Sequence, residues 1–93
     1  MEQKNSVNVD RLPNNASADA ARAYVEEGRL PGGFVKHVLS NDFVGAHGRA
    51  DGTNEAHMDD WAMWLFNDIP SSAWGSEEAV TEWCLSGGLN GDD

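Results

Sequence analysis

The hydrophobic positions of this 93-residue chain recur mostly at the three- and four-residue spacing of a helix. The clearest pattern covers residues 54–69, whose main apolar stripe consists of Met58, Trp61, Leu65 and Ile69. Thr53 is the expected N-cap of this helix, and Pro70 is its expected stop. Trp64 and Phe66 widen the apolar surface. We therefore expect this helix to contact neighbours on more than one side.

Shorter apolar patterns predict four further helices, at residues 18–27, 33–40, 43–49 and 77–85. Ser17 and Ser76 are the expected N-caps of the first and last of these, and Gly28 fits the left-handed position after the first. Pro31 suits the first helical position of the second, because no N–H is needed there.

The pattern as a whole predicts an all-α fold, a compact bundle of four or five short helices around the 54–69 helix. No run alternates at the period of two that is typical of a strand. Gly45 and Gly48 each weaken the 43–49 helix by about 1 kcal/mol relative to alanine, and we expect them to allow close backbone contact with another helix. The expected core side chains are Phe34, Leu39, Phe43, Trp61, Leu65, Trp74 and Trp83.

Length and composition indicate a single domain. We interpret residues 1–16 as a flexible N-terminal arm, residues 17–88 as the helical domain and residues 89–93 as an acidic tail. No apolar run approaches the roughly 18 residues of a membrane span, and the N-terminus lacks the apolar core of a signal peptide. The one cysteine, Cys84, excludes an intramolecular disulfide. These features favour the cytoplasm.

The net charge of −10 is confined to the second half of the chain. Residues 1–49 contain six acids and six Lys or Arg residues, whereas residues 50–93 contain ten acids and no Lys or Arg. This distribution disfavours direct binding to nucleic acid or to an anionic membrane, and a basic protein surface is the compatible partner. The candidate partner-binding residues are Asp51, Glu55, Asp59, Asp60, Asp68, Glu77, Glu78 and Glu82.

Three histidines, at intervals of ten residues, are the first candidates for a metal site: His37, His47 and His57. Asp42, Asp59 or Cys84 would complete the ligand set. The spacing matches no metal-binding motif, so we expect neither a metal nor another cofactor.

The evidence for an enzyme is equally weak. Cys84 lies in the last predicted helix between apolar residues, which favours a small buried core thiol over a nucleophile paired with a histidine. Asp59 and Asp60 are adjacent and diverge by about 100° on a helix, so a solvated face is favoured over an acid–base pair. The Pro31-Gly32-Gly33 turn lacks a phosphate-binding motif. The four tryptophans are mostly expected in the core, with one plausibly at an interface. We expect no enzymatic activity.

Several short segments occur in a specific order: Tyr24, Leu30-Pro31-Gly32-Gly33-Phe34, Val38-Leu39-Ser40-Asn41-Asp42-Phe43, Ala50-Asp51 with Asn54, and Trp74-Gly75-Ser76 before Val80 and Trp83. In this order the chain resembles a widespread family of small uncharacterised bacteriophage and prophage proteins, over about residues 24–83. The resemblance implies a viral or prophage origin and action inside an infected bacterial cell. It implies no activity and no catalytic residues.

Two functional hypotheses follow. In the first, the chain is a small acidic phage protein, a monomer or homodimer, that binds and inhibits a host protein complex for defence or nucleic-acid processing. Its carboxylates would replace DNA phosphates in a basic groove, as in an anti-CRISPR-type inhibitor that is a DNA mimic. The alternative is a module that binds a small molecule, such as a nucleotide signal, between helices lined by Trp and His. That alternative requires clustering of four cations: Arg22, Arg29, Lys36 and Arg49.

Overall fold

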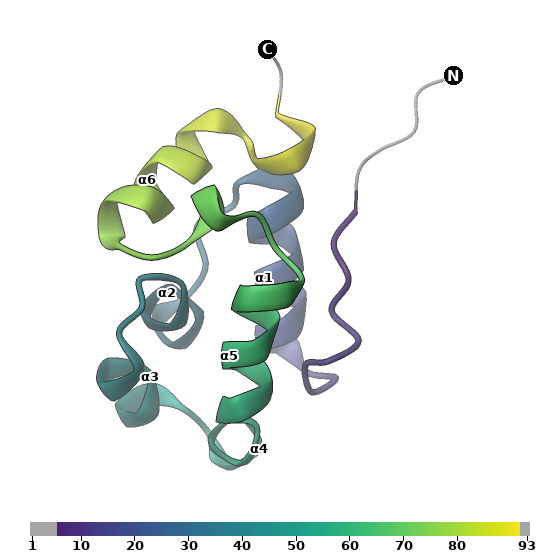
Figure 1. Cartoon of the computed structure of the whole chain (residues 1–93). Coiled ribbons are helices and arrows are strands. Elements are labelled where there is room, and N and C mark those ends of the chain that lie inside the picture. Colours follow the sequence, from purple (N-terminus) through teal and green to yellow (C-terminus); the bar gives the residue numbers. More distant parts are fainter. Residues whose placement is uncertain (1–5, 92–93) are drawn as a thin grey trace.

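The computed structural model describes residues 6–91, and this part of the chain contains six α-helices, two short 3-10 helices and no strand (Figure 1). The all-α prediction is confirmed. The α-helices are α1 (Ala16–Glu27), α2 (Gly33–Leu39), α3 (Phe43–Arg49), α4 (Gly52–Ala56), α5 (Met58–Asn67) and α6 (Glu77–Ser86). Within residues 6–91, no helix is long and apolar enough to cross a membrane.

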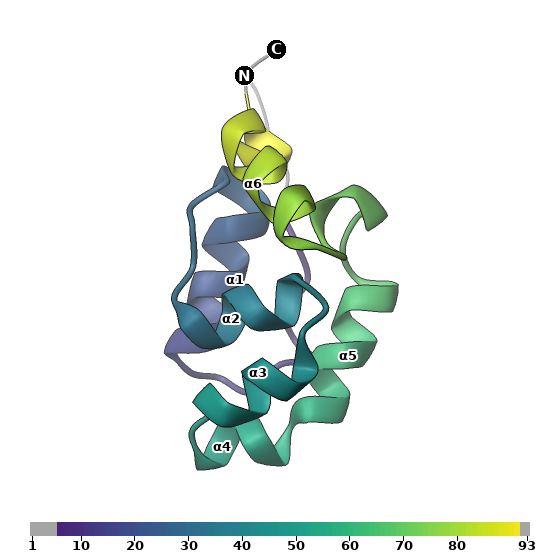
Figure 2. The ribbon, with the colours of Figure 1, turned by 90° about the vertical axis from the view of Figure 1, so that its left-hand side faces the viewer.

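Helix α2 lies at the centre of the bundle and contacts α1, α3, α5 and α6. Figure 2 shows it between α1 and α5, with α6 at one end of the molecule and α4 at the other. Four of its seven side chains are buried: Phe34, Val35, Val38 and Leu39. Because so many of its residues are apolar, this short helix is stabilised mainly by burial.

The predicted helix at 54–69 is divided into α4 and α5 at His57, whose φ of −117° and ψ of 22° interrupt the helix. The N-cap is Asp51 and not Thr53, because Asn54 N donates to Asp51 Oδ1 over 2.8 Å. The apolar stripe begins just after the break, and its four residues, Met58, Trp61, Leu65 and Ile69, are all buried. Pro70 follows the helix as predicted.

Helix α4 is fastened to the start of α1 through Asn54, whose exposed fraction is only 2%. Its amide nitrogen donates to Ser17 Oγ over 2.9 Å, and its amide oxygen accepts from Asn15 Nδ2 over 3.0 Å. Asn15, rather than Ser17, is the N-cap of α1. A buried amide with both ends bonded fixes the direction of α4.

The N-terminal segment 6–15 is docked, contrary to the interpretation of residues 1–16 as a flexible arm. Val7 and Leu12 are buried in the core. Trp64 Nε1 donates to Asn8 O over 2.9 Å, which ties the segment to α5. Most residues of this segment are polar, and this composition concealed two core side chains. Residues 1–5 of the predicted arm lie outside the described part of the chain.

The other predicted ends and core positions are mostly confirmed. Gly28 adopts the left-handed conformation after α1, and Ser76 caps α6. Pro31 precedes the N-cap of α2, which is Gly32, so its predicted place at the first helical position is wrong. Of the predicted core, Phe34, Leu39, Trp61 and Leu65 are buried, whereas Phe43, Trp74 and Trp83 are half-buried against it.

The C-terminal end of the described chain is also packed. Residues 88–90 form a 3-10 helix that contacts α1, and Asn90 Nδ2 donates to Glu26 O over 3.2 Å. Of the predicted acidic tail 89–93, residues 89–91 are therefore part of the domain. Asp92 and Asp93 lie outside the described residues.

Candidate functional site

The predicted partner-binding acids fall into two groups at opposite ends of the molecule. The first group, termed the α4–α5 acids, comprises Asp51, Glu55, Asp59 and Asp60. The second group, termed the α6 acids, comprises Glu77, Glu78 and Glu82. Figures 1 and 2 both place α4 and α6 at opposite ends. The structure therefore does not bring the predicted acids together on one small face.

The carboxylates of these two groups are available to a partner. None of the seven forms an ion pair within residues 6–91. Six are exposed and Asp60 is half-buried. Asp51 Oδ1 is used by the α4 cap. An exposed carboxylate without a cation keeps its charge available to an approaching basic surface.

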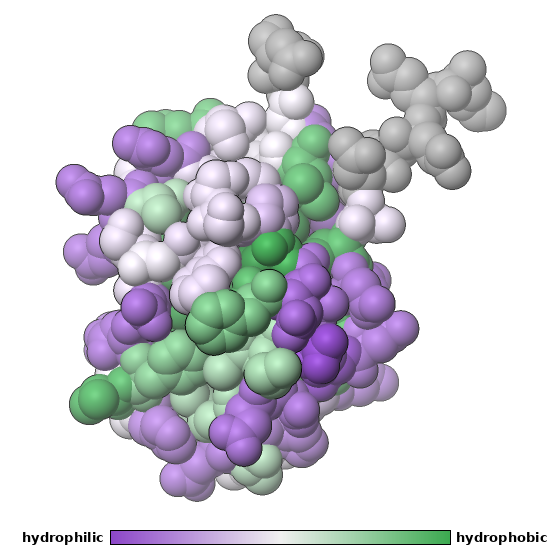
Figure 3. Space-filling model, viewed as in Figure 1, coloured by the Kyte–Doolittle hydropathy of each residue, from purple (hydrophilic) through white to green (hydrophobic). Residues whose placement is uncertain are grey.

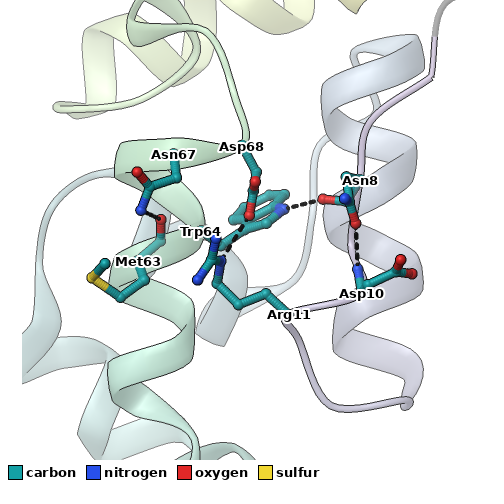
Figure 4. A network of polar contacts seen from close by, with 7 residues as sticks. All are labelled: Asn8, Asp10, Arg11, Met63, Trp64, Asn67 and Asp68. Atoms are coloured by element: carbon teal, nitrogen blue, oxygen red, sulfur yellow. Dashed lines mark hydrogen bonds and ion pairs between the residues drawn. The ribbon is translucent and has the colours of Figure 1, made fainter.

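Asp68 differs from the other seven predicted residues, because it is paired inside the molecule (Figure 4). Its side chain is 15% exposed, and its Oδ2 lies 2.9 Å from Arg11 Nε. Figure 4 places this pair beside Trp64, whose indole bonds to Asn8. Asp68 thus fastens the N-terminal segment to the end of α5 and is not a free carboxylate.

A hydrophobic band separates the two acidic groups. Figure 3 shows it over α3 and α5, with hydrophilic surface around α4 and along α6. Val44 on α3 and Met63 and Phe66 on α5 are exposed large hydrophobic residues. Phe66 is 73% exposed and contacts only the edge-on ring of Trp74 among aromatic residues described, at 5.4 Å between centroids. Phe66 thus widens the apolar surface of α5 as predicted, but this part of the surface is largely exposed and not packed against a neighbouring helix.

A polar pocket lies between α2, α3 and the first residue of α6, with a volume of about 450 Å³. Its polar lining residues are Lys36, His37, Ser40, Asp42, Arg49 and Glu77. Gly75 N donates to Leu39 O over 2.8 Å, which holds the turn before α6 against the end of α2. The segments around Gly33, Ser40 and Gly75 thus meet at or beside this pocket.

His37 and Asp42 form one wall of this pocket. His37 Nδ1 lies 2.9 Å from Asp42 Oδ2, while Gly45 N donates to Asp42 Oδ1 over 3.0 Å. The bond from Gly45 and the bond from His37 lower the pKa of Asp42 below its ordinary value. Asp42 is thus the N-cap of α3 and the partner of His37 at once.

Gly45 makes this arrangement possible. A Cβ at this position would lie 2.6 Å from Asp42 Oδ2 and 2.7 Å from His37 Nδ1. A Cβ at Gly48 would meet nothing within 4 Å. The expectation that both glycines allow helix backbones to approach is therefore wrong, because the close neighbours of Gly45 are side chains.

Two of the four cations considered in the nucleotide hypothesis line the pocket, Lys36 and Arg49. Neither forms an ion pair within the described residues. Arg29 instead pairs with Glu27, with 3.0 Å from Nε to Oε1, and Arg22 lines a separate pocket beside the N-terminal segment. The sequence does not show that Lys36 and Arg49 line the same pocket, because this depends on how α2 packs against α3.

The described residues form neither a metal site nor an activated thiol. Among the described residues, no group of three His, Cys, Asp or Glu side chains is placed to hold a metal. Cys84 is half-buried, and burial raises the pKa of its thiol. Tyr24 is buried with its hydroxyl donating to Ala73 O over 2.6 Å, and burial likewise raises its pKa. Both environments favour the protonated side chain.

Comparison with known proteins does not add to this picture. No protein-family model matches the chain, and searches of curated proteins and of solved structures find no match either.

Proposed function

We propose that this chain is a small acidic phage protein that binds and inhibits a host protein complex through its exposed carboxylates. The target class is a defence or nucleic-acid-processing complex with a basic groove, with complexes of the CRISPR type among the candidates. The protein acts in the cytoplasm of the infected bacterium, as a monomer or homodimer, and binds no nucleic acid directly.

The observation that carries this proposal is the set of seven unpaired carboxylates in a segment without Lys or Arg. Residues 50–93 hold ten acids, and within residues 6–91 only Asp68 of the eight candidate residues has an ion-pair partner. Lys and Arg side chains that line a nucleic-acid groove recognise phosphate oxygens, and carboxylate oxygens offer the same kind of acceptor. Such a surface accelerates association with a basic partner and repels DNA.

The hydrophobic band between the two acidic groups supports the same function. Protein interfaces combine a poorly solvated apolar centre with a polar margin, and a few large side chains dominate their energy. Helix α3 contributes the exposed Val44 and helix α5 the exposed Met63 and Phe66, and α4 and α6 lie at opposite ends of the molecule. The arrangement fits a partner that is itself apolar at its centre and basic at its margin.

The test is affinity capture from a bacterial lysate, using the immobilised full chain at low and at moderate salt, with mass spectrometry of the retained proteins. We expect one nucleic-acid-processing complex, retained less at moderate salt because exposed charges are screened. Added duplex DNA should compete for the same basic groove. An immobilised neutral helical protein of similar size is the control for unspecific retention.

Retention that is insensitive to both salt and duplex DNA would contradict the proposal. So would the absence of any specifically retained protein at both salt concentrations.

A further inference from the structure

The pocket between α2 and α3 contains two cations that the acidic-surface function does not use. Lys36 lies in the last turn of α2, and Arg49 is the last residue of α3. Both line the pocket of about 450 Å³. This volume falls within the range of roughly 300–1,000 Å³ that is typical of small-molecule sites.

Arg49 and Lys36 are uncommitted, whereas Asp42, one of the two carboxylates that line the pocket, is engaged. Within residues 6–91, neither cation forms an ion pair or a side-chain hydrogen bond. The Asp42 carboxylate already accepts from Gly45 and contacts His37. Both cations therefore line the pocket with no ion-pair partner among the described residues, and an anionic ligand would supply one.

The remaining wall offers two further polar groups. His37 uses Nδ1 for Asp42, and its Nε2 forms no hydrogen bond within the described residues. The Ser40 hydroxyl is buried and has no partner in this part of the chain. A buried hydroxyl without a partner is unusual, and this one lies at the pocket wall with almost no exposed surface of its own.

We propose that this pocket binds the phosphate group of a small phosphorylated molecule. The planar Arg49 guanidinium suits two phosphate oxygens, and the Lys36 ammonium supplies a second positive charge. The volume of the pocket leaves space beside the phosphate for the rest of the molecule. This proposal does not depend on the function of the acidic surface.

The Glu77 carboxylate at the edge of the pocket weakens the attraction. Glu77 is the first residue of α6, is exposed, and lines the pocket without an ion-pair partner within residues 6–91. Removal of this negative charge should raise the affinity for phosphate, whereas removal of a cation should lower it. Glu77→Gln is expected to strengthen phosphate binding about two- to threefold, as expected for one exposed charge.

The experiment is an NMR titration of the full chain with inorganic phosphate, adenosine monophosphate, sulfate and chloride at matched ionic strength. Saturable amide shifts around Gly33, Lys36 and Arg49 are expected with phosphate, with a dissociation constant on the order of 1 mM or lower. Tighter binding of adenosine monophosphate than of phosphate identifies a phosphorylated molecule as the ligand. Equal binding identifies inorganic phosphate.

Matched variants assign the site. Arg49→Ala is expected to weaken binding about tenfold, and Arg49→Lys less, because it keeps the charge and loses the planar fork. Arg22→Ala removes an exposed cation from a different pocket and should leave binding within about twofold. Overturning results would be shifts that do not saturate, equal shifts with chloride, or equal losses in Arg49→Ala and Arg22→Ala. Circular dichroism confirms that each variant is folded.

Discussion

At the scale of single residues, Asp42 shows how one side chain links a helix end to a pocket wall. One carboxylate oxygen caps α3 through Gly45 N, and the other holds His37. The sequence places Asp42 between the predicted helices at 33–40 and 43–49, where Asp is a common N-cap. It did not identify the bond to His37, since a contact across the turn depends on the angle between α2 and α3.

The lowered pKa of Asp42 predicts a pH-dependent contribution to stability. A carboxylate whose pKa is lower in the folded state stabilises the fold above its unfolded pKa, and this stability is lost as the pH falls through the folded value. Asp42→Asn keeps an acceptor for the cap and removes the charge. We expect the variant to be less stable than the parent chain at pH 6–7, with a difference that shrinks below about pH 4.

Urea denaturation of both proteins across this pH range measures that difference. A constant difference from pH 7 to pH 3 would contradict the assigned cause.

Gly45 and Gly48 provide a matched pair within one helix. Alanine at Gly48 meets open space and should stabilise α3 by about 0.5–1 kcal/mol. Alanine at Gly45 gains the same helix propensity but displaces His37 or Asp42, so we expect it to be less stable than Gly48→Ala by about 1 kcal/mol or more. Thermal and urea denaturation of the two variants check this order. Equal stability would mean that the two side chains move aside at no cost.

At the scale of elements, helical spacing predicted the positions of most helices because each buries a stripe at that period. The break at His57 was not predictable, because no Gly or Pro marks it and the stripe from Met58 to Ile69 begins only after it. Next to the break, Asn54 bonds to Asn15 and Ser17, nearly forty residues earlier. Such a long-range contact leaves no local pattern in the sequence.

The docked N-terminal segment makes a further prediction. Leu12 is buried and belongs to the core, so Leu12→Ala should destabilise the fold by about 2–3 kcal/mol through lost burial and a cavity. Asp10→Ala is the control, because its side chain is exposed and its replacement should cost no more than about 0.5 kcal/mol. Urea denaturation compares the two. Equal, small effects would show that residues 6–15 are not part of the folded core in solution.

At the scale of the whole molecule, charge composition predicted an acidic surface but not its shape. The number of acids after residue 50 follows from the sequence. Only the fold shows that the α4–α5 acids lie far from the α6 acids and that Asp68 is paired with Arg11. The convergence of Lys36 and Arg49, and the exposure of Phe66, also arise from packing. These features depend on which helices meet, and helix periodicity alone does not determine that.

The most direct test of the central claim compares three triple variants, each of which removes three negative charges, in the lysate capture experiment. One replaces Glu77, Glu78 and Glu82 with Gln, and a second replaces Glu55, Asp59 and Asp60 with the matching amides. The control replaces Asp10, Asp19 and Glu27 in the first half of the chain. If the exposed acids of residues 50–93 bind the target, at least one of the first two variants should retain about tenfold less of it, about 1.4 kcal/mol, and the control should match the parent chain. Equal retention by all three variants would contradict the account.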